Sequence, residues 1–217
     1  PFAELAQQAS TLSAVGALPK TTRKAPPARL SVDVPGRKWQ QIEAFASSLQ
    51  FRQPTRHWLD WCAGKGHLGR LLAQDGQSLC CLEYNAELVE AGQRLSQRHG
   101  LQAEHRRQDV LCASTANPLQ AIHTPVALHA CGDLHVRLLQ LASHTGCLQL
   151  AVAPCCYNRI QSDNYHALSV AAQTSTLRLS KDDLSLPLSE TVTAGSRVRR
   201  QRDQSMARRL GFDLLQR

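Results

Sequence analysis

Apolar and polar positions follow two different periodicities along the middle of the chain. From Lys38 to Gln50 the apolar residues recur every three or four positions, which predicts an amphipathic helix leading into the core. Short apolar runs then alternate with segments of helical periodicity. The predicted strands are 57–60, 78–82, 103–110, 125–130 and 147–153, and the predicted helices are 66–74, 86–98 and 134–141. This alternation predicts an α/β fold with right-handed crossovers and a mostly parallel, Rossmann-like doubly wound sheet.

The two ends of the chain differ from this middle part. Residues 1–37 are rich in Ala, Ser, Thr, Pro and basic residues, which predicts a basic N-terminal appendage or linker with one short helix. The domain itself is expected to cover 38–217. Its last part predicts a helix over 161–177, a strand or extended connection over 177–188, and a final helix over 190–210. The expected inward positions of that last helix are Val192, Val198, Met206 and Leu210.

Length and composition fit one compact domain. The chain has 217 residues, of which 42% are hydrophobic and 19% are charged. It contains neither an apolar run of membrane-spanning length nor a charged-then-apolar leader, so a soluble, cytoplasmic protein without a membrane partner is expected. The chain begins with Pro1 and stops at Arg217 in the middle of an apolar pattern, which indicates a fragment with a C-terminally incomplete domain.

The eight cysteines would suit a disulfide framework only in a small secreted chain. Two pairs are vicinal, Cys80-Cys81 and Cys155-Cys156, and most of the cysteines lie in apolar runs without a Cys-x-x-Cys spacing. Buried, reduced thiols are therefore expected. A zinc site built from His129, Cys131, Cys155 and Cys156 would lack the usual spacing of zinc ligands, so no metal is predicted.

Charge is distributed unevenly along the chain, whose net charge is +8. Residues 1–54 carry seven Lys or Arg against three Asp or Glu, and residues 197–217 carry seven Arg against two Asp. The part between these ends is nearly neutral. Basic ends of this kind suit a polyanionic partner such as RNA, although they also occur as solvated surfaces.

A glycine-rich loop follows the first predicted strand, in the segment Asp60-Trp61-Cys62-Ala63-Gly64-Lys65-Gly66-His67-Leu68-Gly69. Its glycines spell G-x-G-x-x-G, with an acid at Glu83 after the second strand, as in dinucleotide-binding folds. Asp60 argues against a dinucleotide, because its carboxylate would face a pyrophosphate across a short distance. S-adenosylmethionine carries an ammonium and a sulfonium instead, and suits a carboxylate at this position.

This loop resembles the first motif of the class I S-adenosylmethionine-dependent methyltransferases, an acid followed by glycines at the second, fourth and sixth places. Gly64 and Gly66 match, whereas Cys62 replaces the first glycine. The resemblance implies that Glu83, in the pair Glu83-Tyr84, binds the ribose, and that Asp109-Val110 contacts the adenine amino group. The cofactor residues implied are Asp60, Cys62, Gly64, Gly66, His67, Glu83, Tyr84, Asp109 and Val110.

Two cysteine-bearing segments follow the fourth and fifth predicted strands, His129-Ala130-Cys131-Gly132-Asp133 and Pro154-Cys155-Cys156-Tyr157. Together with the loop they are similar to the methyltransferase-like group that includes the glutathione S-transferase C-terminal-domain-containing protein. They are similar, more distantly, to the tRNA 2′-O-methyltransferases that act on the acceptor stem. The resemblance covers about residues 37–217 and implies a substrate pocket between these two strand ends.

Several chemical roles are open to the residues of these segments. His129, Asp133 or Tyr157 could orient or deprotonate an acceptor, because the sulfonium methyl is already a good electrophile. Cys155 or Cys131 could instead add to a pyrimidine ring, or simply line a tight pocket. The predicted catalytic residues are His129, Asp133, Cys155 and Tyr157. Isolated histidines, namely His99, His105, His123 and His144, are expected on the surface or in loops.

Arginines crowd the last predicted helix, at Arg197, Arg199, Arg200, Arg202, Arg208 and Arg209. They form either a solvated surface or a phosphate-binding one, without interleaved aromatic residues that would stack on bases. We expect methyl transfer from S-adenosylmethionine to a macromolecule, with RNA ahead of protein. The alternatives are an NAD-dependent oxidoreductase and a noncatalytic module that binds RNA or protein.

Overall fold

The computed structural model of the chain describes residues 2–12, 14, 16–19, 21, 25–73, 76–112, 117–189 and 196–216. These residues fall into two compact units. The first comprises residues 1–130 and 134–154, and the second comprises residues 131–133 and 155–217.

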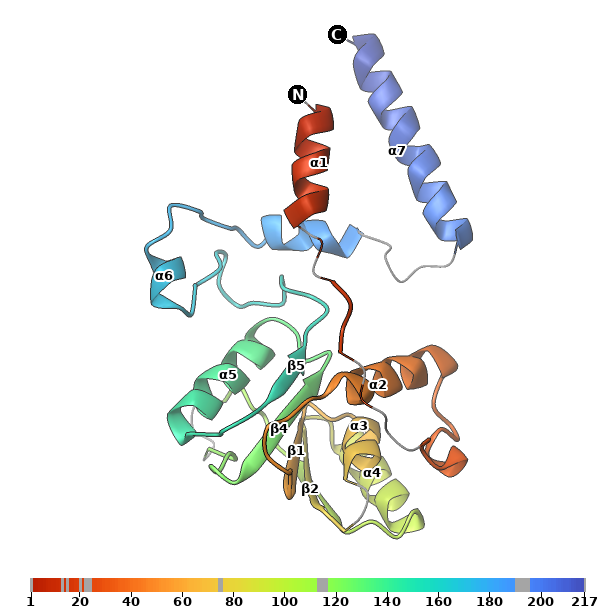
Figure 1. Cartoon of the computed structure of the whole chain (residues 1–217), viewed down its shortest axis with the longest axis vertical. Coiled ribbons are helices and arrows are strands. Elements are labelled where there is room, and N and C mark those ends of the chain that lie inside the picture. Colours follow the sequence, from red (N-terminus) through yellow and green to blue (C-terminus); the bar gives the residue numbers. More distant parts are fainter. Residues whose placement is uncertain are drawn as a thin grey trace. The chain divides into compact units, whose positions relative to one another are not determined.

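A five-stranded parallel sheet forms the centre of the first unit (Figure 1). Its strands are β1 (His57–Trp61), β2 (Ser78–Glu83), β3 (Ala103–Arg107), β4 (His123–Leu128) and β5 (Ala151–Ala153). The strand order is β3-β2-β1-β4-β5, and each neighbouring pair is parallel. The order reverses beside β1, and in doubly wound sheets ligands bind outside the carboxyl ends of the strands at this point. The predicted Rossmann-like fold is therefore confirmed.

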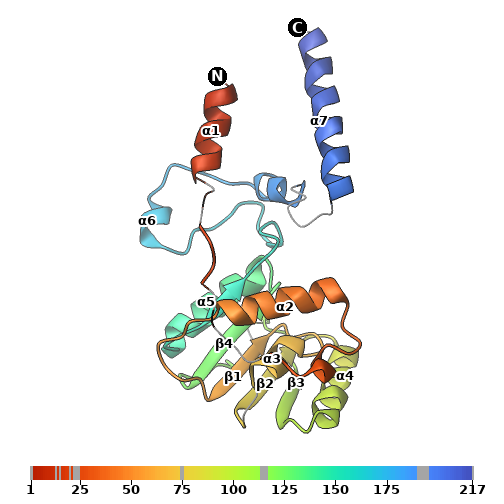
Figure 2. The same ribbon diagram turned by 45° about the vertical axis from the view of Figure 1, so that its right-hand side comes forward.

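Helices cover both faces of this sheet. Figures 1 and 2 show α2 (Gly36–Ser48), α3 (His67–Leu72) and α4 (Ala86–Arg98) on one face and α5 (Asp133–Thr145) on the other. The bounds of α4 coincide with the prediction because Asn85 marks its start: the Asn85 side chain accepts a hydrogen bond from the Leu88 amide at 3.2 Å. The remaining strands and helices of the first unit exist as predicted, with ends that differ by a few residues.

Successive residues of each strand point to opposite faces of the sheet, so the core forms two layers. Trp58 and Leu79 pack with the α2 and α3 side, whereas Leu59, Trp61 and Leu82 pack with the α5 side. The indole N–H of Trp61 donates to the carbonyl of Leu134 at 2.9 Å, so this large buried side chain also has its polar atom satisfied. The two layers together fix which strand residues face α3, and thereby the position of Asp60.

The N-terminal segment contains α1 (Phe2–Leu12) and a single 3₁₀ turn, Ala28–Leu30. Leu30 is buried and belongs to the same core cluster as Leu68 and Ile42. The Thr21 amide and hydroxyl both donate to the carbonyl of Ser47, at 2.7 and 2.8 Å. The stretch predicted as an appendage thus contributes at least one side chain to the core, while the position of the domain boundary stays a prediction.

A hydrogen-bonded turn joins the two stretches of sequence in the second unit. The Gly132 amide donates to the carbonyl of Cys156, and the Asp133 amide donates to the carbonyl of Arg159, both at 3.0 Å. In return, the Asp133 carboxylate accepts from the Gln161 amide at 2.7 Å. Gly132 has a φ of +58°, and a Cβ built there would lie 1.8 Å from the Arg159 carbonyl oxygen. Only glycine therefore fits this position.

The C-terminal predictions are partly wrong. Within 161–177, predicted to be helical, only α6 (Val170–Gln173) is helical, and an isolated antiparallel bridge pairs Asn164 with Ser180. Ser, Asn and Asp side chains hydrogen-bond to nearby backbone here, as Ser169 does to the Ala172 amide, and this competes with helix extension. The stretch predicted as strand or connection contains a 3₁₀ helix, Asp183–Ser189, and no strand within the described residues 177–188.

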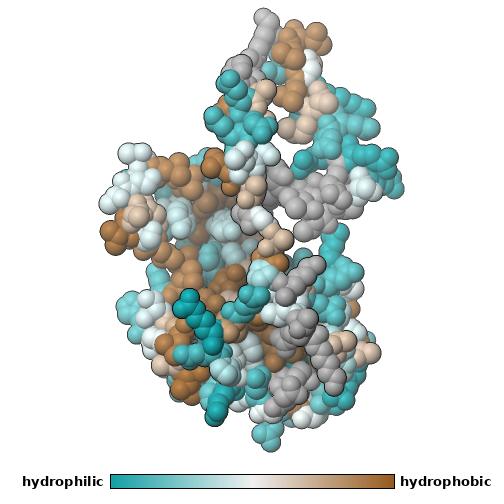
Figure 3. Space-filling model, in the orientation of Figure 1, coloured by the Kyte–Doolittle hydropathy of each residue, from teal (hydrophilic) through white to brown (hydrophobic). Residues whose placement is uncertain are grey.

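The last predicted helix is present as α7 (Ser196–Gln216), but its apolar residues do not form the predicted inward face. Val198, Met206 and Leu210 are 46%, 48% and 60% exposed, so their prediction as inward residues is wrong, and Val192 lies outside the described residues. The reason is that the apolar residues of α7 are spread around the helix instead of forming one stripe. Figure 3 shows hydrophilic residues near the start of α7 and hydrophobic ones at its carboxyl end.

None of the described helices is both long enough and apolar enough to cross a lipid bilayer. All eight cysteines lie among the described residues, and none of them forms a disulfide. Cys81 is buried, six others are half-buried and Cys155 is exposed, so the prediction of buried thiols is right only for Cys81.

The turn at Gly132 provides a test of the second unit. We expect Gly132→Ala to lower the free energy of unfolding by about 1 to 2 kcal/mol for the left-handed backbone conformation, with about 1 to 3 kcal/mol added by the clash with Arg159. Gly146→Ala is the matched control, because Gly146 also has a positive φ, of +75°, but has nothing within 4 Å of the added Cβ. Urea unfolding of both variants measures the difference. Equal losses would contradict the described packing of residues 131–133 against 155–161.

Candidate functional site

A tightly turned loop follows β1 at the carboxyl end of the sheet. Cys62, Gly64 and Gly66 have φ values of +56°, +56° and +70°, so every second residue takes the left-handed conformation. The Ala63 amide donates to the carbonyl of Leu82 at 2.9 Å, which ties the loop to the end of β2. At Gly64 a Cβ atom would meet nothing within 4 Å, so the space beside this residue is open to a ligand.

Cys62 occupies the place where the first motif of the resembling family has glycine. It keeps the backbone conformation that glycine adopts readily, which costs a non-glycine residue about 1 to 2 kcal/mol. The loop therefore keeps its shape despite the substitution. Neighbouring hydrogen bonds hold this strained conformation in place. The Ala63 amide donates to the Leu82 carbonyl, and the Gly66 amide donates to the Ala63 carbonyl.

Asp60 lies beneath the loop on the α3 side of the sheet, and it is only 2% exposed. Its Oδ2 atom accepts a hydrogen bond from the Gly69 amide at 2.8 Å. A Cβ at Gly69 would lie 3.0 Å from that oxygen and 2.6 Å from Leu79 Cδ1, so glycine allows this close approach of α3 to β1. Burial raises the pKa of Asp60 to about 7, against the opposing effects of the Gly69 hydrogen bond and the Arg70 charge. Asp60 therefore titrates near neutral pH.

Glu83 ends β2 beside the open loop. Its Oε2 accepts from the Gly64 amide at 2.9 Å, and its Oε1 accepts from the Asn85 amide at 3.0 Å. Each carboxylate oxygen can accept more than one hydrogen bond, so both remain able to bind a ligand hydroxyl. The following residue, Tyr84, is 65% exposed, which leaves its ring free to contact a ligand at the same edge.

Arg70 is a buried cation beneath the loop that the sequence interpretation missed. Its guanidinium donates to the carbonyl of Lys65 and to Nδ1 of His67, the latter at 2.8 Å. Because arginine only donates, His67 Nδ1 must be the unprotonated acceptor. Burial, and then the Arg70 charge, lower the pKa of His67 to about 3. The signal available in the sequence was an arginine three residues after His67 in an otherwise apolar helix.

His105 was predicted on the surface or in a loop, and this is wrong. It is half-buried in β3, and its ring lies where Cβ atoms of Gly66 and Gly92 would be. Its Nε2 is 2.9 Å from the Ser96 hydroxyl. Burial, and then the Arg70 charge, lower the pKa of His105 to about 4. His105 thus supports the loop from β3. His123 was misplaced in the same way, because it begins β4.

Asp109 and Val110 follow β3 next to the end of β2. The Gln108 amide donates to the Glu83 carbonyl at 2.9 Å, which brings this segment to the Glu83 end of the sheet. Asp109 Oδ1 accepts from the Leu111 amide at 3.0 Å and closes a local turn. Val110 is 7% exposed and packs in the core. Asp109 is therefore the one of the two placed to contact a ligand.

His129 follows β4 and is exposed. Its φ is +66°, and its amide donates to the Ala153 carbonyl of β5 at 3.0 Å. Its Nε2 lies 3.1 Å from Oε1 of Gln41 in α2. Partial burial, and then the Lys38 charge, lower the pKa of His129. A neutral imidazole, which can accept a proton, is thereby favoured.

The other predicted catalytic residues, Asp133, Cys155 and Tyr157, lie in the second unit. The Asp133 carboxylate is used by the Gln161 amide, and Tyr157 is 47% exposed. Burial and the neighbouring thiols of Cys131 and Cys156 raise the pKa of Cys155 to about 12. A raised pKa lowers the thiolate fraction of Cys155, and its covalent role stays a prediction.

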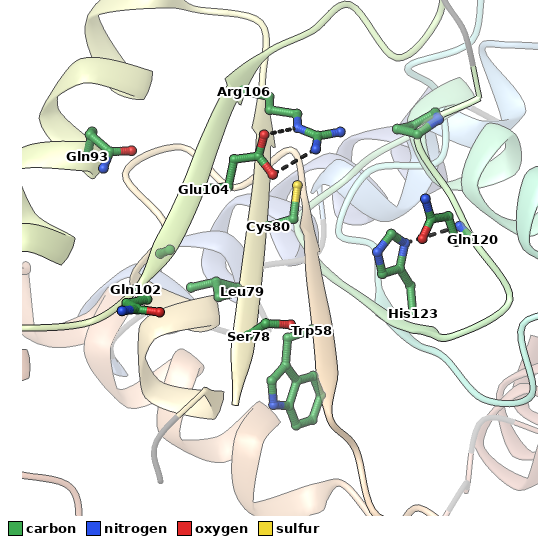
Figure 4. Close-up of a pocket in the computed structure, with 12 residues that line it drawn as sticks. Trp58, Ser78, Leu79, Cys80, Gln93, Gln102, Glu104, Arg106, Gln120 and His123 are labelled. Atoms are coloured by element: carbon green, nitrogen blue, oxygen red, sulfur yellow. Dashed lines mark hydrogen bonds and ion pairs between the residues drawn. The ribbon is translucent and has the colours of Figure 1, made fainter. Parts of the chain in front are cut away.

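A separate hollow of about 610 Å³ lies at the other end of the strands (Figure 4). Trp58, Ser78 and Ala103, which stand at or next to the starts of β1, β2 and β3, line it. Arg106 and Glu104 form an ion pair there beside Cys80. In a parallel sheet the starts of the strands are opposite to the ligand-binding edge, so this hollow is distinct from the loop site.

The model of a family described as "Methyltransferase domain" matches residues 37–163. Among solved structures, M. capricolum TrmK bound to S-adenosyl-homocysteine is similar with a TM-score of 0.38 and 11% identity, over 56% of this chain and 52% of that one. A SAM dependent methyltransferase from Aquifex aeolicus is similar with a TM-score of 0.34 and 13% identity, over 75% and 80%. This chain thus spans about half the length of TrmK. No curated protein matches it.

The match to the family model covers the whole loop, the sheet and the ends of β2 to β5. It therefore includes each of the cofactor residues that the sequence suggested, from Asp60 to Val110. Two acids and an open glycine loop at the carboxyl edge of a parallel sheet suit S-adenosylmethionine, the cofactor of the class I fold. The chain belongs to the methyltransferase domain family and has the class I, S-adenosylmethionine-dependent fold.

Proposed function

We propose that this chain transfers a methyl group from S-adenosylmethionine to a macromolecular acceptor, with RNA favoured over protein. The observation that supports it most is the pair of carboxylate–amide bonds at the loop, Asp60 to Gly69 and Glu83 to Gly64. They hold a loop with an open edge at Gly64 where doubly wound sheets bind their ligands. The family match supplies the reaction class.

The residues around the loop fit the charges of the cofactor. S-adenosylmethionine supplies a methyl group on a positively charged sulfonium, which is reactive without further activation. Asp60 attracts this positive methionine end across the thin loop, and Glu83 accepts from the ribose hydroxyls. Asp109 lies after β3 at the same edge and accepts from the adenine amino group. Gly64, Gly66, Cys62 and His67 shape the wall of this site, and Tyr84 and Val110 flank it.

The acceptor side needs a group that aligns the nucleophile and removes its proton. His129 suits proton removal because it is exposed and its pKa is lowered. Asp133 and Tyr157 belong to the second unit, and their role toward the acceptor stays a prediction from the sequence. The covalent alternative through Cys155 is disfavoured because the pKa of its thiol is raised to about 12.

The preference for RNA is supported by charge. The chain carries a net charge of +8, and Arg197, Arg200, Arg208 and Arg209 of α7 are exposed. Arg202 is partly neutralised by Asp203, with N and O atoms 3.5 Å apart, and the side chain of Arg199 is outside the described residues. Arginines without neighbouring stacking aromatics bind phosphates irrespective of sequence. α7 would therefore contribute affinity, and the acceptor site would contribute selectivity.

The charge on Asp60 gives a pH-dependent prediction. Below about pH 7 the carboxyl is neutral, and above it the carboxylate attracts the cationic cofactor, so affinity for S-adenosylmethionine rises as pH increases from about 6 to 8. Asp60→Asn keeps an oxygen for the Gly69 amide but removes the charge. We expect this variant to bind about tenfold more weakly at about pH 8 and nearly as well as the wild type at about pH 6. Isothermal titration calorimetry measures both.

Asp60→Asn also serves as the control for the pH dependence, because any titration of the cofactor's own ammonium group affects the variant and the wild type equally. His67 and His105 have pKa values of about 3 and 4, so neither titrates over this range. Parallel pH profiles for the two proteins would contradict a role for the Asp60 charge. Binding of NAD in place of S-adenosylmethionine would contradict the proposed cofactor.

The acceptor class is tested by transfer of tritiated methyl from S-adenosylmethionine into an undermethylated cell extract. We expect labelled material that nuclease releases and protease does not, because RNA is the proposed acceptor. Label released only by protease would make the chain a protein methyltransferase. Cofactor binding without any transfer would support a noncatalytic module instead.

The contribution of α7 is tested with the double variant Arg208→Gln/Arg209→Gln. Two lost phosphate contacts should weaken RNA binding and lower the slope of log affinity against log salt by about 1.4 to 1.8. Arg52→Gln/Arg56→Gln is the matched control, since it removes the same charge from two exposed arginines before β1. Equal effects of the two pairs in a salt series would show that only total charge matters.

A further inference from the structure

Three cysteine thiols meet in the second unit. Cys131 Sγ lies 3.0 Å from Cys155 Sγ, and Cys155 Sγ lies 3.5 Å from Cys156 Sγ. All three sulfurs lie within 4.8 Å of one another. In the chain, Cys131 follows β4 after two residues and Cys155 follows β5 after one, so the cluster joins the segments behind two neighbouring strands.

The backbone around these thiols is fixed by bonds that do not involve sulfur. Gly132 binds the Cys156 carbonyl, and Asp133 binds the Arg159 carbonyl, each through its amide. At Gly132 there is no room for a side chain, because a Cβ would lie 1.8 Å from the Arg159 carbonyl oxygen. The three sulfurs are therefore brought together by the fold before anything binds to them.

A backbone amide also contacts one sulfur of the cluster. The Cys155 amide donates to Cys131 Sγ at 3.4 Å. Hydrogen bonds of this kind stabilise negative charge on sulfur.

Such a set of thiols has the chemistry of a zinc site. Zinc binds thiolate sulfur at about 2.3 Å in tetrahedral geometry, which places two sulfurs about 3.8 Å apart. The pairs at 3.0 and 3.5 Å need to separate by less than an ångström to reach this spacing. A thiolate set also excludes hard ions such as magnesium and calcium, which prefer oxygen.

We propose that Cys131, Cys155 and Cys156 bind one zinc ion. Three S–H bonds lose their protons to solvent, three Zn–S bonds form, and a water molecule takes the fourth position. No sulfur is oxidised. The ion holds the turn at residues 131–133 to the segment at 155–161, a role that goes beyond methyl transfer and does not depend on it. The sequence spacing predicted no metal because the ligands come from segments that only the fold brings together.

The test starts from protein purified without chelators or metal-affinity resin. We expect one zinc per chain by elemental mass spectrometry, and a thiolate-to-metal charge-transfer band when cobalt(II) replaces zinc. Cys131→Ser and Cys155→Ser should each lose most of the bound zinc and the band. Cys147→Ser is the matched control, because the Cys147 thiol is half-buried outside the cluster and donates to the Gln120 carbonyl, which a serine hydroxyl can replace.

A second measurement does not require the variants to fold. In the wild-type protein, zinc should protect Cys131, Cys155 and Cys156 from alkylation, and removal of zinc with a chelator should expose them, while Cys147 reacts equally in both states. The proposal is overturned if wild-type protein takes up neither zinc nor cobalt(II), or if the serine variants retain zinc. A Cys131–Cys155 disulfide in the freshly isolated protein would also overturn it. None of these readouts uses methyl transfer, so failure of the proposed reaction leaves them unaffected.

Discussion

The loop at the carboxyl edge of the sheet depends on a carboxylate buried underneath it. Asp60 comes from the central strand and is nearly inaccessible to solvent, yet it accepts the amide of Gly69 and lies in the field of Arg70. Removing a carboxylate from water is costly, and here that amide and the nearby cation offset only part of the cost. The same burial brings the pKa of Asp60 to about 7, so the group that orders the loop can also change charge in the physiological range.

The rest of the site is arranged around this loop by bonds to the backbone. Glu83 holds the Gly64 amide from β2, His105 supports Gly66 from β3, and Arg70 holds the carbonyl of Lys65 from α3. Three strands and one helix therefore determine the path of a few residues. A loop held in this way needs little reorganisation when a ligand binds, and this favours affinity. It also explains how Cys62 can occupy a left-handed position that suits glycine better.

The sequence was most informative where a local rule and the fold agree. Alternating apolar runs predicted the parallel sheet, and helical periodicity predicted the bounds of α4, because these signals act within a few residues. The acids at 60 and 83 were found from their spacing to the glycines. The half-burial of His105 could not be predicted in the same way, since it depends on contacts of β3 with Gly66 and Gly92, which lie far from it in the chain. The burial of Arg70 was missed although its partners Lys65 and His67 lie within five residues of it. α7 differs from its prediction for another reason, because its apolar residues do not share one face of the helix.

Residues 131–133 form a short insertion of the second unit within the first. Sequence on both sides of them belongs to the first unit, so the second unit consists of two pieces separated by α5 and β5. A polypeptide that begins at Cys155 would lack the Asp133 carboxylate that binds the Gln161 amide and the Gly132 amide that binds the Cys156 carbonyl. A continuous fragment that contains the whole second unit therefore also contains α5 and β5 of the first unit. During synthesis its amino-terminal contacts must wait until about twenty further residues of the first unit have been added, which makes its folding the later event.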